Sequence, residues 1–183
     1  MHESALLYDQ ALLKQAHALA SELGILLKAR NIMLTLAESC TGGMVAETIT
    51  SLPGSSAWFD CGLVTYSNQS KIELLKVLSQ TLETYGAVSE AVAKEMALGC
   101  LSRITPDKTH TYIAGSITGI AGPDGGTAEK PVGTVCFAWS GLNLSTQTDL
   151  FTQAETKIFS GNRQQIRQQA TVFMLQNLIK ILG

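Results

Sequence analysis

A glycine-led turn between an apolar segment and a helical segment constrains the fold of this chain most. Residues 32–37 are apolar and of strand length, and they precede Thr41-Gly42-Gly43 and a helical segment at 44–51. Paired glycines allow backbone conformations that other residues avoid, so the pattern predicts a strand, a tight turn and a helix. The free N–H groups of a helix's first turn can bind an oxyanion or a phosphate. We therefore expect chemistry at this junction.

The rest of the chain alternates in the same way. Three-and-four spacing of apolar residues predicts helices, and shorter apolar runs predict strands. The expected helices span 4–30, 68–77, 90–104 (with Ser89 as N-cap) and a closing segment from 161; the expected strands span 59–66, 111–118, 132–139 and 144–152, the last two as a hairpin around 141–143. This alternation predicts an α/β fold in which helices cover both faces of a sheet.

Composition excludes several classes of protein. The 183 residues suit one domain, 1–183, and a hydrophobic content of 45% with 15% charged residues is typical of a compact globule. A net charge of −2 without a basic cluster argues against nucleic-acid binding, and no apolar run is long enough to cross a membrane. The cysteines Cys40, Cys61, Cys100 and Cys136 are widely spaced, and the N-terminus lacks the features of a secretory signal. We expect reduced thiols and a cytoplasmic protein.

Ser39 is the first candidate nucleophile because it lies where the apolar run meets the glycine turn. Serine is also a common helix N-cap, which is the alternative role. The G-x-S-x-G elbow of α/β-hydrolases is absent, since Ala37 and Thr41 occupy the glycine positions. Cys40 is a stronger nucleophile by nature but is more often buried. Ser39 therefore ranks before Cys40.

A serine nucleophile needs a base, and the three histidines of the chain are poor candidates. His2 and His17 lie in the opening segment and His110 stands between two threonines. Lys71, in the first turn of an expected helix, can act as the base if its ammonium is desolvated. Its pKa must then fall by about three units from ~10.4, at a cost of roughly 4 kcal/mol. The alternative is an ordinary exposed lysine.

Further candidates surround these two residues. Glu38 can orient the site or complement the helix N-terminus, and Tyr66 can donate a hydrogen bond to the nucleophile or simply end a strand. The loop at 119–127 is rich in glycine and resembles an anion cradle, although it matches neither nucleotide-binding glycine signature. Lys130 and Arg163 can supply positive charge for a phosphate. No spacing of His, Cys or carboxylates indicates a metal site.

Five motifs in order resemble one known family, the CinA carboxy-terminal domain family, over nearly the whole chain. They are Ala37-Glu-Ser-Cys-Thr-Gly-Gly43, Val64-Thr-Tyr-Ser-Asn-x-x-Lys71, Gly86-Ala-Val-Ser89, Thr118-Gly-Ile-Ala-Gly-Pro-Asp-Gly-Gly126 and Lys130-Pro-Val-Gly-Thr134. The resemblance implies a three-layer α/β/α sandwich with a mixed sheet of about five strands. It also implies a cofactor-free, metal-independent amidase that converts nicotinamide mononucleotide to nicotinic acid mononucleotide and ammonia in pyridine-nucleotide salvage.

The resemblance also assigns roles to residues. Ser39 would be the nucleophile, Lys71 the base and Tyr66 a supporting hydrogen-bonding group. The amides of Thr41, Gly42 and Gly43 would hold the oxyanion, and the nucleotide would lie against Gly119, Ala121, Gly122, Gly125 and Gly126. A non-catalytic nucleotide-binding module of the competence and damage type is the alternative, and an amidase for another small amide is a third. Apolar residues on the first and last helices allow a homodimer or simply cover the sheet.

Overall fold

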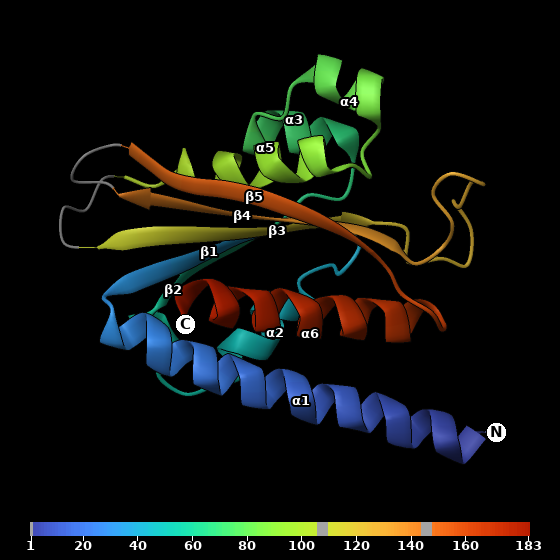
Figure 1. The fold of residues 1–183 in the computed structure, drawn as a ribbon, viewed down its shortest axis with the longest axis horizontal. Helices are drawn as coiled ribbons and strands as arrows, with labels where there is room; N and C mark the ends of the chain where they lie inside the picture. Colours follow the sequence, from blue (N-terminus) through green and yellow to red (C-terminus); the bar gives the residue numbers. More distant parts are fainter. Residues whose placement is uncertain (1, 106–109, 144–147) are drawn as a thin grey trace.

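The computed structural model describes residues 2–105, 110–143 and 148–183, and Figure 1 shows three layers. Helices α1, α2 and α6 cover one face of a five-stranded sheet, and α3, α4 and α5 cover the other. The elements are α1 (His2–Ala29), β1 (Ile32–Glu38), α2 (Met44–Thr50), the short 3-10 helix η1 (Ser55–Ala57), β2 (Phe59–Val64), α3 (Asn68–Leu75), α4 (Ser79–Tyr85), α5 (Glu90–Leu101), β3 (Thr111–Gly119), β4 (Thr134–Asn143), β5 (Thr148–Ile158) and α6 (Arg163–Leu182). The predicted α/β/α sandwich is confirmed.

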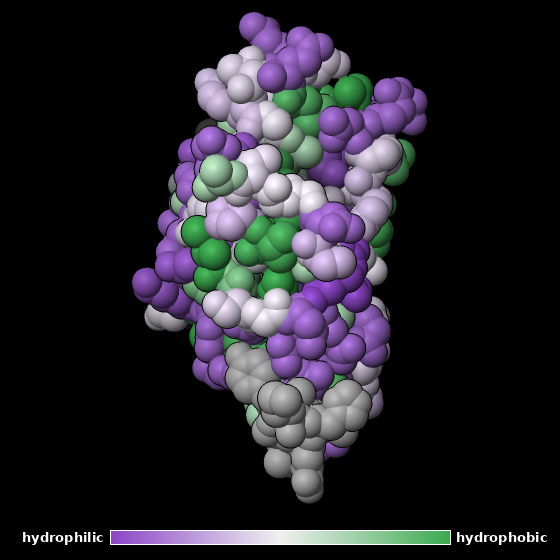
Figure 2. Space-filling model, turned by 90° about the vertical axis from the view of Figure 1, so that its right-hand side faces the viewer, coloured by the Kyte–Doolittle hydropathy of each residue, from purple (hydrophilic) through white to green (hydrophobic). Residues whose placement is uncertain are grey.

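The sheet is mixed, with strand order β2-β1-β3-β4-β5. Strand β1 pairs in parallel with both β2 and β3, whereas β4 is antiparallel to β3 and to β5. The carboxyl ends of β1, β2 and β3 therefore meet at one edge, on the right of Figure 1. Figure 2 looks onto this side and shows hydrophobic residues gathered at the centre of the face with hydrophilic residues around them. Ligands of α/β sheets commonly bind at such an edge.

Strand β1 is buried on both faces, which explains why its sequence is a nearly continuous apolar run. Leu34 and Leu36 belong to the core beneath α1, α2 and α6. Ala37 belongs to the core on the opposite face, where Met96 and Cys100 of α5 pack. The central strand is thus fixed from both sides, and the residues that follow it start from a rigid position.

Two local predictions differ from the structure. The helix α4 was not predicted, because Ser79–Tyr85 is short and contains only one buried residue, Leu82. The segment 141–143 was predicted as a turn but continues β4, where Gly141 pairs with Phe151. A Cβ at Gly141 would lie 2.6 Å from the Phe151 ring, so the glycine serves close packing within a strand. The link at 144–147, where the second hairpin strand was predicted to begin, lies outside the described residues.

The predicted cap of α5 is confirmed. The Ser89 hydroxyl accepts a hydrogen bond from the Val92 amide at 3.3 Å and caps α5 as expected. None of the helices in the described ranges is long and apolar enough to cross a membrane.

Candidate active site

Ser39 and Lys71 meet at the carboxyl edge of the sheet. Ser39 directly follows β1, and Lys71 lies in the first turn of α3, shortly after β2. Because β1 and β2 are parallel neighbours, the two side chains arrive at the same place. The Lys71 ammonium Nζ lies 3.1 Å from Ser39 Oγ and donates to the Thr65 carbonyl oxygen at 2.9 Å. Thirty-two residues of sequence separate a pair that the sheet brings into contact.

Lys71 is buried, with 1% of its surface exposed, so the exposed-lysine alternative is wrong. Helix α3 packs against α5, and Gly99 of α5 lies so close to the Leu75 carbonyl that a Cβ there would overlap it. This close approach fixes the C-terminal end of α3 against α5. Burial lowers the pKa of Lys71 because the ammonium loses water.

Glu38 complements the start of α2, which is the second of its two predicted roles. Its carboxylate is 1% exposed. Oε2 accepts from the amides of Gly43 at 3.0 Å and Val45 at 3.2 Å, and Oε1 accepts from Ala46 at 2.9 Å. The N-cap residue is Gly43, so the alternative in which Ser39 caps the helix is wrong. The buried Glu38 carboxylate thus caps the N-terminus of α2 in place of an N-cap side chain.

These bonds change the set of amides that can face a ligand. The Gly43 amide donates to Glu38, and the Gly42 amide donates to the Ser39 carbonyl at 3.0 Å. Both glycines have positive φ angles, 62° and 92°, which explains why glycine is required in this turn. The amides of Cys40 and Thr41 approach the Cys40 sulfur. The expectation that Gly42 and Gly43 present free N–H groups is therefore not met in this structure.

Cys40 is a poor nucleophile in this setting. Its side chain is buried, and burial raises the pKa of the thiol to about 12. Because the thiolate is the reactive form, a thiol with this pKa stays protonated near pH 7. Electrostatics therefore favour the Ser39 hydroxyl over its neighbour.

A cavity of about 220 Å³ opens above this pair. Its lining comprises Ser39, Cys40, Tyr66, Asn68, Lys71, Ala87, Val88, Thr118, Gly119, Ala121 and Arg163. Arg163 crosses its rim: Nη1 donates to the Gly122 carbonyl at 2.7 Å and Nη2 donates to Tyr66 Oη at 2.8 Å. Tyr66 is 64% exposed, so the reactive pair lies at the bottom and the arginine at the opening.

Comparison with known proteins decides the family. The model of the CinA C-terminal domain matches residues 16–182, which is almost the entire chain. The chain belongs to the CinA C-terminal domain family. A nicotinamide-nucleotide amidohydrolase PncC from Enterobacter agglomerans is 52% identical over 167 residues, covering 91% of this chain and 95% of that protein. The protein of the same name from Escherichia coli K12 is 49% identical, covering 87% and 90%.

Solved structures show the same fold. A CinA superfamily protein from Klebsiella pneumoniae 700603 superposes with a TM-score of 0.80 at 35% identity, covering 91% of this chain and 97% of that one. The similarity spans nearly the full length of both chains, so it includes the edge of the sheet that holds the cavity.

Several predicted site residues of this CinA domain lie away from the cavity lining. Lys130 donates through Nζ to the carbonyl oxygens of Tyr85 at 2.8 Å and Val88 at 2.7 Å, so it anchors the wall of the cavity. Gly125 and Gly126 belong to the loop before Lys130 and do not line the cavity. Direct contact of these three residues with a ligand stays a prediction.

Sequence reasoning did not single out four of the lining residues: Asn68, Ala87, Val88 and Thr118. Thr118 Oγ1 donates to the Ala87 carbonyl at 2.8 Å and so ties β3 to the opposite wall. All four lie inside the motifs that carry the family resemblance. Those motifs were therefore the signal that could have identified them.

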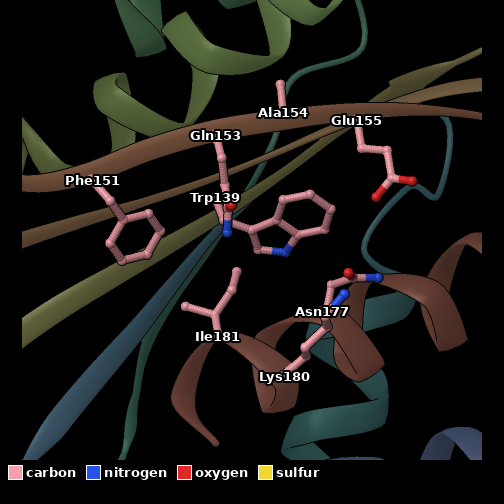
Figure 3. A pocket seen from close by; sticks show the side chains of 8 residues that line it. All are labelled: Trp139, Phe151, Gln153, Ala154, Glu155, Asn177, Lys180 and Ile181. Atoms are coloured by element: carbon pink, nitrogen blue, oxygen red, sulfur yellow. The ribbon is translucent and has the colours of Figure 1, made fainter.

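A larger cavity of about 400 Å³ lies between β5 and α6 and shares no lining residue with the cavity at Ser39. Figure 3 shows the Trp139 indole between the sheet and the helix, with Glu155, Asn177 and Lys180 around it. Glu155 forms an ion pair with Lys157. None of the predicted site residues lines this cavity, and it contains no serine or cysteine. Size alone therefore does not identify the reactive site.

The described residues contain no group of three or more His, Cys, Asp or Glu side chains that could hold a metal ion.

Proposed function

We propose that this protein is a nicotinamide-nucleotide amidase that hydrolyses the carboxamide of nicotinamide mononucleotide to nicotinic acid mononucleotide and ammonia in pyridine-nucleotide salvage. The 3.1 Å contact between buried Lys71 and Ser39 carries the proposal, because it joins a hydroxyl to a desolvated amine at the base of a cavity. The names of relatives that are about half identical over most of the chain support the choice of substrate.

The contacts of Lys71 suggest how the reaction proceeds. As an ammonium, Nζ donates to both Ser39 Oγ and the Thr65 carbonyl. As a neutral amine, it keeps one N–H on Thr65 and turns its lone pair toward the Ser39 hydroxyl. Lys71 then takes the hydroxyl proton as Oγ attacks the amide carbon, and it returns that proton to the leaving nitrogen when the C–N bond breaks. Water next cleaves the Ser39 ester and releases the acid.

The oxyanion of this reaction needs hydrogen-bond donors, and the structure limits which backbone amides can serve. The Gly42 and Gly43 amides donate to oxygen atoms, whereas the amides of Cys40 and Thr41 approach only the Cys40 sulfur, which is a weak acceptor, so we assign the role to Cys40 and Thr41. Both follow the nucleophile directly, as donors of an oxyanion hole often do. Glu38 contributes indirectly by holding the start of α2 and with it the turn that carries these amides.

Arg163 is the group we assign to the phosphate of the nucleotide. Its planar guanidinium suits bidentate binding of phosphate, and it lies at the rim of the cavity, where Tyr66 and Gly122 are its partners. Arg163→Gln should raise KM for the mononucleotide and leave activity toward free nicotinamide, which lacks the phosphate, unchanged. We further propose a cytoplasmic location, which is supported by four cysteines that are free thiols.

Ammonia release from nicotinamide mononucleotide tests the proposal. We expect Ser39→Ala and Lys71→Met to lose on the order of 10² to 10⁴ in kcat, the usual contribution of general acid–base catalysis or more. Ser56→Ala and Lys94→Met are matched controls, since both residues are exposed and neither lines the cavity. These controls should retain full activity.

The same assay separates the alternatives. An active Ser39→Ala protein would refute the serine mechanism. Wild-type protein that binds the mononucleotide but releases no ammonia between pH 6 and 9 would favour the non-catalytic module. Preferred hydrolysis of another amide in a panel of nicotinamide-bearing compounds would favour an amidase for a different small amide.

A further inference from the structure

The cavity is lined by two cationic side chains and no carboxylate. Lys71 lies at its base and Arg163 at its rim. Among the described residues, no Asp or Glu pairs with either: Lys71 contacts Ser39 and Thr65, and Arg163 contacts Gly122 and Tyr66. A buried ammonium without a counter-ion is costly, so an anion that reaches Lys71 would be stabilised there.

The two cations discriminate between the substrate and the product of the proposed reaction. Nicotinamide mononucleotide carries one anionic group, the phosphate, and offers a neutral amide to Lys71. Nicotinic acid mononucleotide has the same shape but carries a carboxylate in place of the amide. The product therefore presents one anion to each cation, whereas the substrate leaves Lys71 without a counter-charge.

We propose that the acid nucleotide binds in this cavity as an inhibitor, with its carboxylate on protonated Lys71 and its phosphate on Arg163, and that this inhibition strengthens as pH falls. The inference rests on the proposed function for the identity of the two nucleotides. It adds regulation to the site: accumulated product holds the base in its protonated, inactive form.

The pH dependence follows from the protonation that each ligand prefers. The amide is attacked only when Lys71 is neutral, and burial makes that form accessible by lowering the pKa of Lys71. The carboxylate binds the protonated form, so its binding draws a proton onto Lys71. Linkage then requires the affinity for the acid, relative to the amide, to rise by up to tenfold for each unit of falling pH.

The charged groups around Lys71 do not reproduce this effect. Cys40 after β1 stays protonated because burial raises its pKa to about 12. Arg163 at the start of α6 and Tyr66 after β2 are hydrogen-bonded to each other. Glu38 directs its carboxylate at the amides of α2.

The acidic residues of α3 and α5 also have hydrogen-bond partners elsewhere. On α5, Glu90 accepts from Thr156 and Glu95 accepts from Leu78 and Thr81. On α3, Glu73 accepts from Gln69, and the nearby Lys76 donates to the Glu73 carbonyl. Lys71 is therefore the group whose protonation should distinguish the two nucleotides.

The test is equilibrium binding of both nucleotides to Ser39→Ala, which removes the attacking hydroxyl, at pH values from 6.5 to 9.5. The ratio of the acid's affinity to the amide's cancels the titration of the phosphate that both ligands share. We expect this ratio to increase several-fold as pH falls through the range. In Ser39→Ala/Lys71→Met the ratio should be independent of pH and should no longer favour the acid.

An affinity ratio that does not change with pH in Ser39→Ala would overturn the inference. The inference would also fail if the ratio changed with pH to the same extent in the double variant. Failure of both nucleotides to bind would refute this ligand class for the cavity. If the double variant does not fold, the wild-type protein supplies the measurement. The Ki of the acid divided by the KM of the amide must then decrease as the pH decreases. Loss of ammonia release in wild type would refute the amidase proposal alone, since the binding ratio does not depend on turnover.

Discussion

Replacing Glu38 with glutamine tests whether the buried carboxylate organises the turn after β1. In the wild type, three amides share its two oxygens, at 2.9, 3.0 and 3.2 Å. Glutamine has one oxygen, so either Ala46 or the Gly43 and Val45 pair must face an NH₂ donor. A bond to a charged group contributes about 1.5–3 kcal/mol, and the bonds that remain become neutral and weaker. We expect Glu38→Gln to lose about 3–5 kcal/mol of unfolding free energy.

Urea denaturation measures this loss, and Glu47→Gln is the matched control. Glu47 lies in the first turn of the same helix but is exposed, so its charge contributes only a few tenths to about 1 kcal/mol through the helix dipole. Because the turn carries Ser39 and the two proposed oxyanion donors, kcat should also fall in Glu38→Gln and not in Glu47→Gln. A loss below about 1 kcal/mol, equal to that of the control, would refute the account of Glu38 as the cap of α2.

Three further predictions follow from the packing around the reactive pair. Gly99→Ala should destabilise the protein by about 1–3 kcal/mol or more in urea denaturation, because the new methyl group overlaps the Leu75 carbonyl and displaces α3. The displacement should also lower kcat. A variant with wild-type stability would contradict this packing. Cys40 should resist iodoacetamide at pH 8 in the folded protein, since its thiol has a pKa of about 12, and rapid alkylation monitored by mass spectrometry would contradict its burial. The pKa of Lys71 is lowered in the folded state, so the unfolded state binds more protons between that pKa and about 10.5. The wild type should therefore gain stability over Lys71→Met as pH rises through this window. Parallel curves of unfolding free energy against pH for the two proteins would contradict this prediction.

The order and type of most elements could be predicted because their causes are local. The apolar run before Glu38, the glycines of the turn and the Ser89 cap all act within a few residues. The sequence failed where the cause was distant. The sequence predicts a turn at Gly141, yet the glycine is needed because Phe151 packs over it from β5. Helix α4 has one buried residue and hence no periodic pattern to detect.

In the candidate site, too, local features could be predicted from the sequence and long-range contacts could not. Ser39 and Lys71 could be proposed from their positions, but whether Lys71 was exposed or buried depended on how α3 packs against α5. The role of Glu38 was likewise open in the sequence, since a carboxylate before a helix can face a ligand or the helix itself. Lys130 could not be placed, because its partners are the carbonyls of Tyr85 and Val88, more than forty residues away.

The sequence alone determined the strand–turn–helix unit, the sheet covered on both faces and the residue types available for chemistry, because hydrophobic periodicity and glycine conformations are short-range effects. Only the tertiary structure decided which of those residues meet. Parallel pairing of β1 with β2 joins the amine to the hydroxyl, and burial of α3 removes the water that would keep the amine charged. Contact and desolvation depend on the whole molecule, and no local pattern encodes them.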